Sequence, residues 1–343
     1  MRKKLYRVLI TVLVVLLSII VVINLPIIQV NHKDSDNDYS NWMRDSLSND
    51  KFVTDVKMLG AHDAFSQEIN YFSDVDTSAD SILKGFVGKL IKGFIVKQSV
   101  TQIASPNELL KNGVRYFDVR LTYDNDTWVT KHNYVSGEFE PIADEIISFL
   151  TANKGEFLVL DFQHISGVDY SSDEDYLNFY NMLDEYGLLE YIYQVSSNNL
   201  DNLTYGELTN NGLESKLIII DKFTKVDKNT MLYSSSIRSN WANSDSFDDV
   251  YSFLEDEKVS VENSDYSNFV VMQAVTTMNM SPSGFSDAIM NWSLIERAEK
   301  FNSFLIQQDN FLELTETLPI IMVDYCNSAP FIDDIMELIM ENN

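Results

Sequence analysis

The sequence GVRYFDVR, residues 113–120, is typical of a buried strand that carries charged side chains. Its β-branched and aromatic residues favour a strand, and alternate residues of a strand share a face. Asp118 and Arg120 are therefore expected to project from the same side. An acid and an arginine in this arrangement form either a structural ion pair or part of a functional site. The neighbouring motifs favour the functional site.

Two of the four histidines lie at the ends of other strand-like runs. Residues 59–63 (LGAHD) end one run with His62 and Asp63, and a short run after residue 127 ends near His132. Imidazole is the side chain best suited to moving protons near neutral pH. Two imidazoles beside one guanidinium supply a base, an acid and a fixed positive charge. In-line displacement at a phosphodiester requires those three groups.

Apolar strand-like runs alternate with longer helical patterns through most of the chain. This alternation predicts a parallel α/β sheet. The number of strands, with no glycine-rich phosphate loop after the first, favours a TIM-type (β/α)8 barrel over a doubly wound sheet. The strand-like runs are residues 56–61, 114–121, 128–131, 157–162, 217–222, 269–275 and 320–324. The helical patterns cover residues 141–152, 174–186, 247–255, 292–308 and 331–341.

In barrels of this type the chemistry lies at the carboxyl ends of the strands. Several polar residues fall at or near such ends in this sequence. They are His62, Asp118, Arg120, His132, Gln163, Lys222 and Asp324. Their common placement predicts one site at one end of the barrel.

Residues 1–30 predict a membrane anchor. A head with four cations precedes an apolar run that begins at residue 8. Extended to residue 30, the run is long enough for a bilayer, which takes ~20 apolar residues. No small-x-small cleavage site follows, so an uncleaved signal anchor is favoured over a cleaved signal peptide, which would release the protein. The cations place the N-terminus in the cytoplasm and residues 42–343 outside, after a polar stalk at residues 31–41.

The formal net charge of −27 argues against nucleic acid as a partner, because phosphate backbones would be repelled. The basic head belongs to the anchor, so the exported part is more acidic still. The single cysteine, Cys326, permits no internal disulfide. It is expected to pack in the interior rather than to act as a nucleophile.

Residues 81–107 contain no acid in a strongly acidic chain. Within them, residues 82–97 carry lysines and two apolar rows spaced by four, which predicts one amphipathic helix. A basic amphipathic helix can lie in a membrane interface. The alternative is a helix that packs against the barrel and keeps its lysines in water. Glycines within this stretch weaken the helix in isolation.

Taken together, these strings resemble the X domain of phosphatidylinositol-specific phospholipase C. The nearer likeness is to the small X-domain-only proteins and their bacterial relatives. Besides residues 113–120, the resemblance is carried by LGAHDAFS (59–66), LVLDFQHISG (158–167) and IIMVDYCNSAPFIDDIM (320–336). It covers about residues 42–338 and implies a (β/α)8 barrel that is often imperfectly closed.

The resemblance also implies roles for the site residues. His62 is expected to act as general base on the inositol 2-hydroxyl, and His132 to protonate the departing diacylglycerol oxygen. Arg120 would stabilise charge on the non-bridging phosphate oxygens. The first product would be a cyclic inositol phosphate. Three acids would hold these groups: Asp324 for His62, and Asp63 and Asp118 for His132 and Arg120.

The resemblance implies a site without metal or other cofactor. In calcium-dependent members of the family, acids occupy places that here hold Arg120 and Gln163. A guanidinium cannot bind Ca²⁺ but can supply its positive charge. Gln163, Lys222, Arg238 and Trp241 are candidates for substrate contact, with Trp241 as a stacking surface for a sugar ring. For Lys222, Arg238 and Trp241 an ordinary structural role is the simpler explanation.

The expected function is an extracellular, membrane-tethered phosphodiesterase that cleaves phosphatidylinositol or a related glycolipid at a membrane surface. Residues 8–30, and on the interfacial interpretation residues 82–97, would contact the membrane. Two other functions remain open. One is a metal-dependent glycerophosphodiester phosphodiesterase on a similar barrel, which EDTA would inactivate. The other is a catalytically silent surface-binding module. If the site is catalytic, alanine in place of His62 or His132 should abolish turnover and leave lipid binding largely intact.

Overall fold

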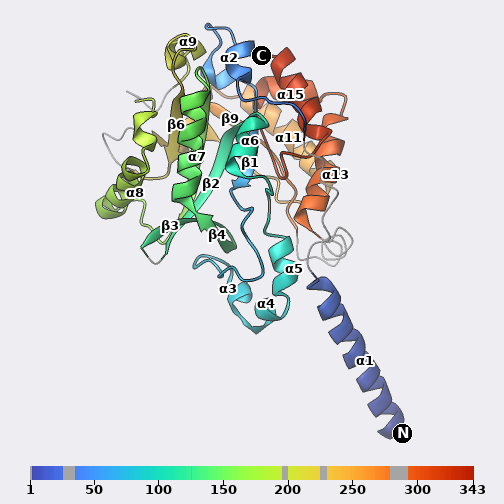
Figure 1. The fold of residues 1–343 in the computed structure, drawn as a ribbon. Coiled ribbons are helices and arrows are strands. Elements are labelled where there is room, and N and C mark those ends of the chain that lie inside the picture. The colour runs from blue at the N-terminus through green and yellow to red at the C-terminus, as the bar shows by residue number, and fades with distance from the viewer. Residues whose placement is uncertain (1, 26–34, 125, 195–199, 225–229, 279–292) are drawn as a thin grey trace.

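A computed structural model describes residues 2–25, 35–124, 126–194, 200–224, 230–278 and 293–343. Within them, eight strands pair in parallel in the order β7-β6-β5-β2-β1-β10-β9-β8, and helices surround the curled sheet (Figure 1). The strands are β1 (Met58–Ala64), β2 (Val114–Asp124), β5 (Phe157–Ser166), β6 (Lys216–Asp221), β7 (Met231–Leu232), β8 (Ile237–Arg238), β9 (Phe269–Ala274) and β10 (Ile320–Val323). The α/β barrel that the sequence predicts is confirmed.

The barrel is interrupted between its two shortest strands. β7 pairs with β6 and β8 pairs with β9, but no pairing joins β7 to β8 in the described residues. The short helix α10 (Tyr233–Ser236) lies between them in the chain. The imperfect closure implied by the family resemblance is therefore located at this point of the wall.

A hairpin outside the parallel order carries one of the expected site residues. β3 (Thr127–His132) pairs antiparallel with β2, and β4 (Tyr134–Glu138) pairs antiparallel with β3. The strand-like run at residues 128–131 therefore belongs to this hairpin and not to the barrel wall. Its return path brings His132 back from the end of β2 to Asp63, near the end of β1.

The longer helices agree with the sequence patterns. They are α7 (Phe139–Ala152), α8 (Asp173–Glu185), α11 (Phe247–Glu262), α13 (Leu294–Ile306) and α15 (Phe331–Glu341). In α7 the buried Ile142, Ile146 and Leu150 recur every four residues and face the sheet. Shorter elements without a sequence prediction are α2 (Trp42–Ser46), η1 (Val53–Asp55), α6 (Pro106–Lys111), η2 (Leu188–Glu190), α9 (Tyr205–Thr209) and α14 (Phe311–Thr317).

The core at the amino end of the barrel contains a buried ion pair. Arg115 of β2 lies 2.8 Å from Glu156, and neither side chain is exposed. The guanidinium also donates to the backbone carbonyls of Leu110 and Tyr39 and stacks 4.8 Å from the ring of Phe149. One arginine of GVRYFDVR is therefore structural, whereas Arg120 lies at the opposite end of the same strand.

The N-terminal helix α1 (Arg2–Ile23) projects away from the barrel (Figure 1). By length and composition it could cross a membrane, and it is the one such helix in the described residues. A signal sequence has the same character, so the anchor stays a prediction. Of the expected stalk, residues 31–34 lie outside the described residues. Ser35 and Tyr39 donate to Asp333 of α15 at 2.5 and 3.0 Å, so this part of the stalk is held against the barrel.

The single helix predicted at residues 82–97 is wrong. The chain forms three short helices there, α3 (Ser81–Lys84), α4 (Phe86–Leu90) and α5 (Lys92–Lys97). Gly85 has an extended backbone that ends α3 and begins α4, and Ile91 separates α4 from α5. Glycine in a helix interior costs about 1 kcal/mol relative to alanine, which is consistent with a break at this position.

Candidate active site

A cavity of about 520 Å³ lies at the carboxyl end of the barrel strands. β1 contributes two adjacent residues to its lining, β2 and the β3 hairpin contribute one each, and the residue after β10 contributes a fifth. These residues are His62, Asp63, Arg120, His132 and Asp324. The strand ends therefore bring together residues that are up to 262 positions apart in sequence.

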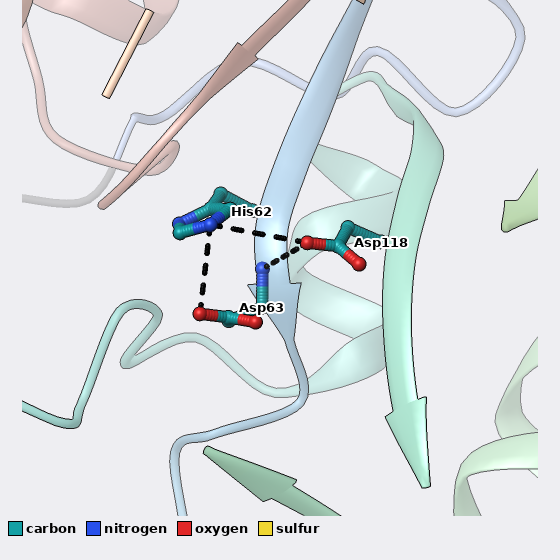
Figure 2. A group of neighbouring side chains, drawn as sticks. All are labelled: His62, Asp63 and Asp118. Carbon is teal, nitrogen blue, oxygen red and sulfur yellow. Dashed lines mark hydrogen bonds and ion pairs between the residues drawn. The ribbon is translucent and has the colours of Figure 1, made fainter. Parts of the chain in front are cut away.

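A β-bulge aims two consecutive residues of β1 at this cavity. The register between β1 and β2 shifts between Ala61 and Ala64, and Asp63 has φ 40°. In a regular strand, neighbours point to opposite faces, whereas a bulge re-aims the side chains beside it. His62 and Asp63 thereby lie close together, next to Asp118 of β2 (Figure 2).

His62 is surrounded by three carboxylates. Its Nδ1 lies 2.7 Å from Asp324 Oδ1, and its Nε2 lies 3.5 Å from Asp63 Oδ2 and 3.9 Å from Asp118 Oδ2. Burial opposes a charge on the ring, but Asp63 and Asp324 outweigh it and raise the pKa of His62 to about 9. Asp324 holds Nδ1, which leaves Nε2 beside Arg120, 3.5 Å from a guanidinium nitrogen.

His132 lies across the cavity, with its ring centroid 6.4 Å from that of His62. Its Nδ1 is 2.9 Å from the carbonyl oxygen of Ser99, and its Nε2 is 3.1 Å from Asp63 Oδ2. Burial, together with the charges of Arg120 and His62, outweighs Asp63 and lowers the pKa of His132. In the free site His62 therefore holds a proton more tightly than His132 does.

Arg120 bridges two acids. Its Nε pairs with Asp63, and a terminal nitrogen lies 3.3 Å from Asp118 Oδ2. Burial opposes the charge, but these carboxylates raise the pKa of Arg120 above its ordinary value. Burial also opposes the charge on Asp63, yet Arg120 and His132 lower its pKa. The guanidinium stays charged at the floor of the site and is held from two sides.

The site contains one group of side chains of the types that bind metal ions. Ligand atoms of His62, Asp63 and Asp118 all lie within 4.8 Å of one another, and no other such group occurs in the described residues. Arg120 pairs with both carboxylates of this group. A divalent cation would have to displace a guanidinium that already supplies the positive charge. The residues present therefore do not fit a calcium site.

Gln102 joins two of the strand ends that carry site residues. Its buried amide nitrogen donates to the carbonyls of His62 and Val323, at 3.2 and 3.0 Å, and its oxygen accepts from the backbone of Cys326 at 3.1 Å. Sequence reasoning missed this residue and also Ser99. Ser99 acts through a backbone carbonyl, which every residue has, so no sequence signal could have identified it.

Two of the four candidates for substrate contact line the cavity. Gln163 is almost fully buried there, and Trp241 is half exposed, with its indole nitrogen donating to Thr277 at 2.8 Å. His164, the residue after Gln163, also lines the cavity. Burial, with the charges of Arg120 and Lys222, lowers the pKa of His164 to about 4, so it is a neutral ring at pH 7.

The other two candidates are not among the lining residues. Lys222 Nζ lies 4.8 Å above the ring of Tyr233. Arg238 pairs with Glu257 of α11 at 2.6 Å and also donates to Ser260. Arg238 therefore makes an ordinary structural ion pair outside the cavity, which agrees with the simpler explanation of its position. Cys326 is fully buried and fits the expected packing role.

Three sequence relatives match this chain in part. A PI-PLC X-box domain-containing protein of Dictyostelium discoideum is 25% identical over 314 residues, 85% of this chain and 39% of that protein. A variant-surface-glycoprotein phospholipase C of Trypanosoma cruzi is 30% identical over 42% of this chain and 40% of that protein. The PI-PLC X domain-containing protein 3 of Mus musculus is 32% identical over 34% of this chain and 38% of that protein. The matches thus span about two fifths of each of these relatives, and no family model matches the chain.

Solved structures share the fold over nearly the whole chain. A mutant phosphatidylinositol-specific phospholipase C from Staphylococcus aureus aligns with 89% of this chain and 97% of its own, with a TM-score of 0.60 and 16% identity. The phosphatidylinositol-specific phospholipase C from Listeria monocytogenes aligns with 89% of this chain and 99% of its own, with a TM-score of 0.58 and 15% identity. At these identities the likeness concerns the fold.

Proposed function

Since this chain is related in sequence to the phosphatidylinositol-specific phospholipase C X-domain family and has the fold of the bacterial enzymes, we propose that it is a phosphodiesterase of the phospholipase C type. Its substrate is phosphatidylinositol or a related glycolipid. The observation that carries the proposal is the convergence of His62, His132 and Arg120 on one cavity. There they would supply the base, the acid and the positive charge for one phosphodiester bound in the cavity.

In the proposed reaction the inositol 2-hydroxyl attacks phosphorus and its proton passes to Nε2 of His62. The bond from phosphorus to the diacylglycerol oxygen breaks, and His132 gives that oxygen a proton. Arg120 stabilises the charge that builds on the non-bridging oxygens. The products are a cyclic inositol phosphate and diacylglycerol. The reaction needs His62 neutral and His132 protonated. His62 holds its proton more tightly in the free site, so this reactive form is the less populated of the two singly protonated forms.

The acids of the site hold these groups in position. Asp324 orients His62 through Nδ1. Asp63 contacts both His132 and Arg120, and Asp118 holds Arg120 from the other side. Gln163 and Trp241 are the proposed head-group contacts, because both line the cavity. A neutral amide and an indole ring suit the hydroxyls and the apolar face of a sugar ring.

The proposed location is the outer face of a cell membrane, with α1 as a single-pass anchor. The apolar length of α1 supports this, and so do the four cations at its start. The proposed reaction uses no metal, since Arg120 occupies the place where a cation would sit. A glycerophosphodiester phosphodiesterase with a bound cation would lose activity in EDTA, whereas we expect full activity here.

The test is turnover of phosphatidylinositol by the full chain in detergent micelles, followed by phosphorus NMR with EDTA present. We expect the resonance of a cyclic phosphodiester to appear and to be absent with His62→Ala. Leu177→Ala, on the exposed face of α8, is the control and should retain full turnover. If no inositol lipid is converted, or if EDTA abolishes conversion, the proposed function is wrong.

A further inference from the structure

Part of the cavity lining, apart from the catalytic groups, is apolar. This apolar wall is built from α3, α4–α5 and the chain after β9, none of which carries a proposed catalytic residue. It consists of Ile82, Leu83, Ile91, Phe94, Ile95 and Met278. A phosphorylated sugar needs no hydrocarbon surface of this kind, so the wall is available to a different part of the substrate.

The end of α1 packs against the back of this wall. Ile23, the last residue of α1, is 8% exposed and forms a cluster with Phe94, which is 4% exposed. Ile91, Ile95 and Met278 pack against that cluster. The same four side chains therefore belong to the cluster that holds the end of α1 and also line the catalytic cavity. Only one layer of side chains separates α1 from the cavity.

The side chain of Asn24 holds this contact in place, because it both donates and accepts a hydrogen bond. Its side-chain nitrogen donates to the carbonyl of Leu90 at 3.1 Å, and its side-chain oxygen accepts from the backbone of Gly93 at 2.7 Å. A Cβ added at Gly93 would lie 2.8 Å from the carbonyl oxygen of Asn24. Glycine is thus required for this close approach. The direction in which α1 leaves the barrel is set by the elements that form the wall.

The outer side of the same helices is apolar and free of acids. Phe86 is 80% exposed, and Val87 and Leu90 are also exposed. Residues 81–107 contain no acid, and Lys84 and Lys89 lie among the exposed apolar side chains. α3 and α4 lie at the end of the molecule from which α1 projects (Figure 1). A lipid surface entered by α1 would meet this face.

We propose that the apolar wall binds the hydrocarbon chains of a membrane lipid, which enters the cavity from the bilayer that contains α1. The occupant is a lipid chain because the wall is continuous with the apolar anchor helix and with an exposed face that lacks acids. The inference deepens the proposed function, on which it rests for the head group. It adds that the lipid moiety is bound in the cavity and is drawn from the membrane of the anchor.

The first experiment maps lipid contacts without requiring turnover. The full chain with His132→Ala is reconstituted in phosphatidylcholine vesicles with phosphatidylinositol that carries a photoreactive diazirine in its acyl chain. After irradiation, mass spectrometry should find adducts at residues 82–95 and 278, as well as on α1. Adducts confined to α1 would overturn the proposal. In a parallel sample without irradiation, a bifunctional amine reagent that crosslinks residues 84–92 of two copies would also overturn it, since a second chain would then cover the face.

Two substitutions sharpen this result. Ile91→Asp places a charge in the wall, and we expect about tenfold fewer adducts at residues 82–95, because an unpaired charge is strongly disfavoured in an apolar site. Leu177→Asp places the same charge on α8 and should leave the adducts unchanged. If Ile91→Asp fails to fold, Ile91→Ala is used, with a smaller loss expected. If the adducts form but the unsubstituted chain does not turn over phosphatidylinositol, the proposal for the wall stands and only the proposed function is refuted.

The second experiment tests the Asn24 contact. Asn24→Ala removes both hydrogen bonds to the wall elements, and we expect a several-fold lower rate on phosphatidylinositol in vesicles, with an unchanged rate in detergent micelles. Ser18→Ala is the matched control, because it removes a hydrogen bond to Val14 inside α1 and leaves the wall intact. Equal vesicle rates for Asn24→Ala and Ser18→Ala would contradict a role for the anchor in delivering lipid.

Discussion

At the scale of single residues, His62 and His132 differ in the oxygen that each is proposed to serve. General acid catalysis matters only when the leaving oxygen needs a proton. With a nitrophenyl ester of inositol phosphate, whose leaving group departs as a stable anion, we expect His132→Ala to keep most of its activity. With either substrate, His62→Ala should lower the rate by about 10²- to 10⁴-fold. Nitrophenol absorbance gives the rates, and the reverse pattern would exchange the two roles.

The pH dependence reports the two pKa values directly. Below the lowered pKa of His132 the rate falls, because His62 remains protonated. Above about pH 9 it falls again, because His62 is already neutral while His132 continues to lose its proton. We therefore expect a bell-shaped profile of kcat/KM between these limits.

Asp324→Asn tests the cause of the alkaline limit. Asp324 helps to raise the pKa of His62, so its loss should move the alkaline limb to lower pH and reduce the maximum rate. Glu190→Gln, an exposed acid on η2 far along the chain from the site, is the control. An alkaline limb that does not move with Asp324→Asn would show that His62 does not set it.

At the scale of elements, β2 carries one arginine for stability and one for the site. Arg115→Met leaves the carboxylate of Glu156 buried without its positive partner, which costs about 3–5 kcal/mol when one member of such a pair is removed. The double variant with Glu156→Met should recover much of that loss. Thermal unfolding followed by circular dichroism measures both. A single variant as stable as the natural chain would mean that Glu156 is protonated or solvated.

The long elements could be predicted from sequence, because each repeats its apolar pattern over several turns or alternations. β7 and β8 could not, since two residues such as Ile237 and Arg238 carry no period. The segment at residues 82–97 has a helical period, but Gly85 ends the first helix there. Periodicity records which side chains share a face and not where the backbone turns. The pattern therefore predicted helical structure at residues 82–97 correctly, but it was wrong to predict one continuous helix.

The candidate site was predictable for a topological reason. Parallel strands bring their carboxyl ends together, so polar residues at those ends, such as His62 and Asp324, meet without any sequence proximity. Residues that contact the site from loops could not be predicted in this way, because they do not lie at strand ends. Gln102 and Ser99 lie on the segment between β1 and β2, and one of them acts through its backbone. Arg238 lies at a strand end yet pairs with α11, because strand position alone does not set side-chain direction.

At the scale of the whole molecule, α1 and the cavity lie at one end and the buried Arg115 pair lies at the other. The stalk residues that pack on α15 and the Asn24 contact hold the chain at two places. α1 is therefore tied to the barrel and not merely linked to it by a polar segment. This arrangement keeps the mouth of the barrel next to the membrane that α1 would enter.

The orientation of the whole chain can be tested with introduced cysteines. Cys326 is fully buried and its pKa is raised by burial, so it should not react with a maleimide. Leu213 is 68% exposed on the barrel, and Lys4 precedes the apolar run. In intact cells an impermeant maleimide should label Leu213→Cys and spare Lys4→Cys, and both should react after permeabilisation. Labelling of Lys4→Cys alone in intact cells would reverse the topology. Recovery of a shorter chain from the medium would show a cleaved signal peptide, and the anchor would have to be abandoned.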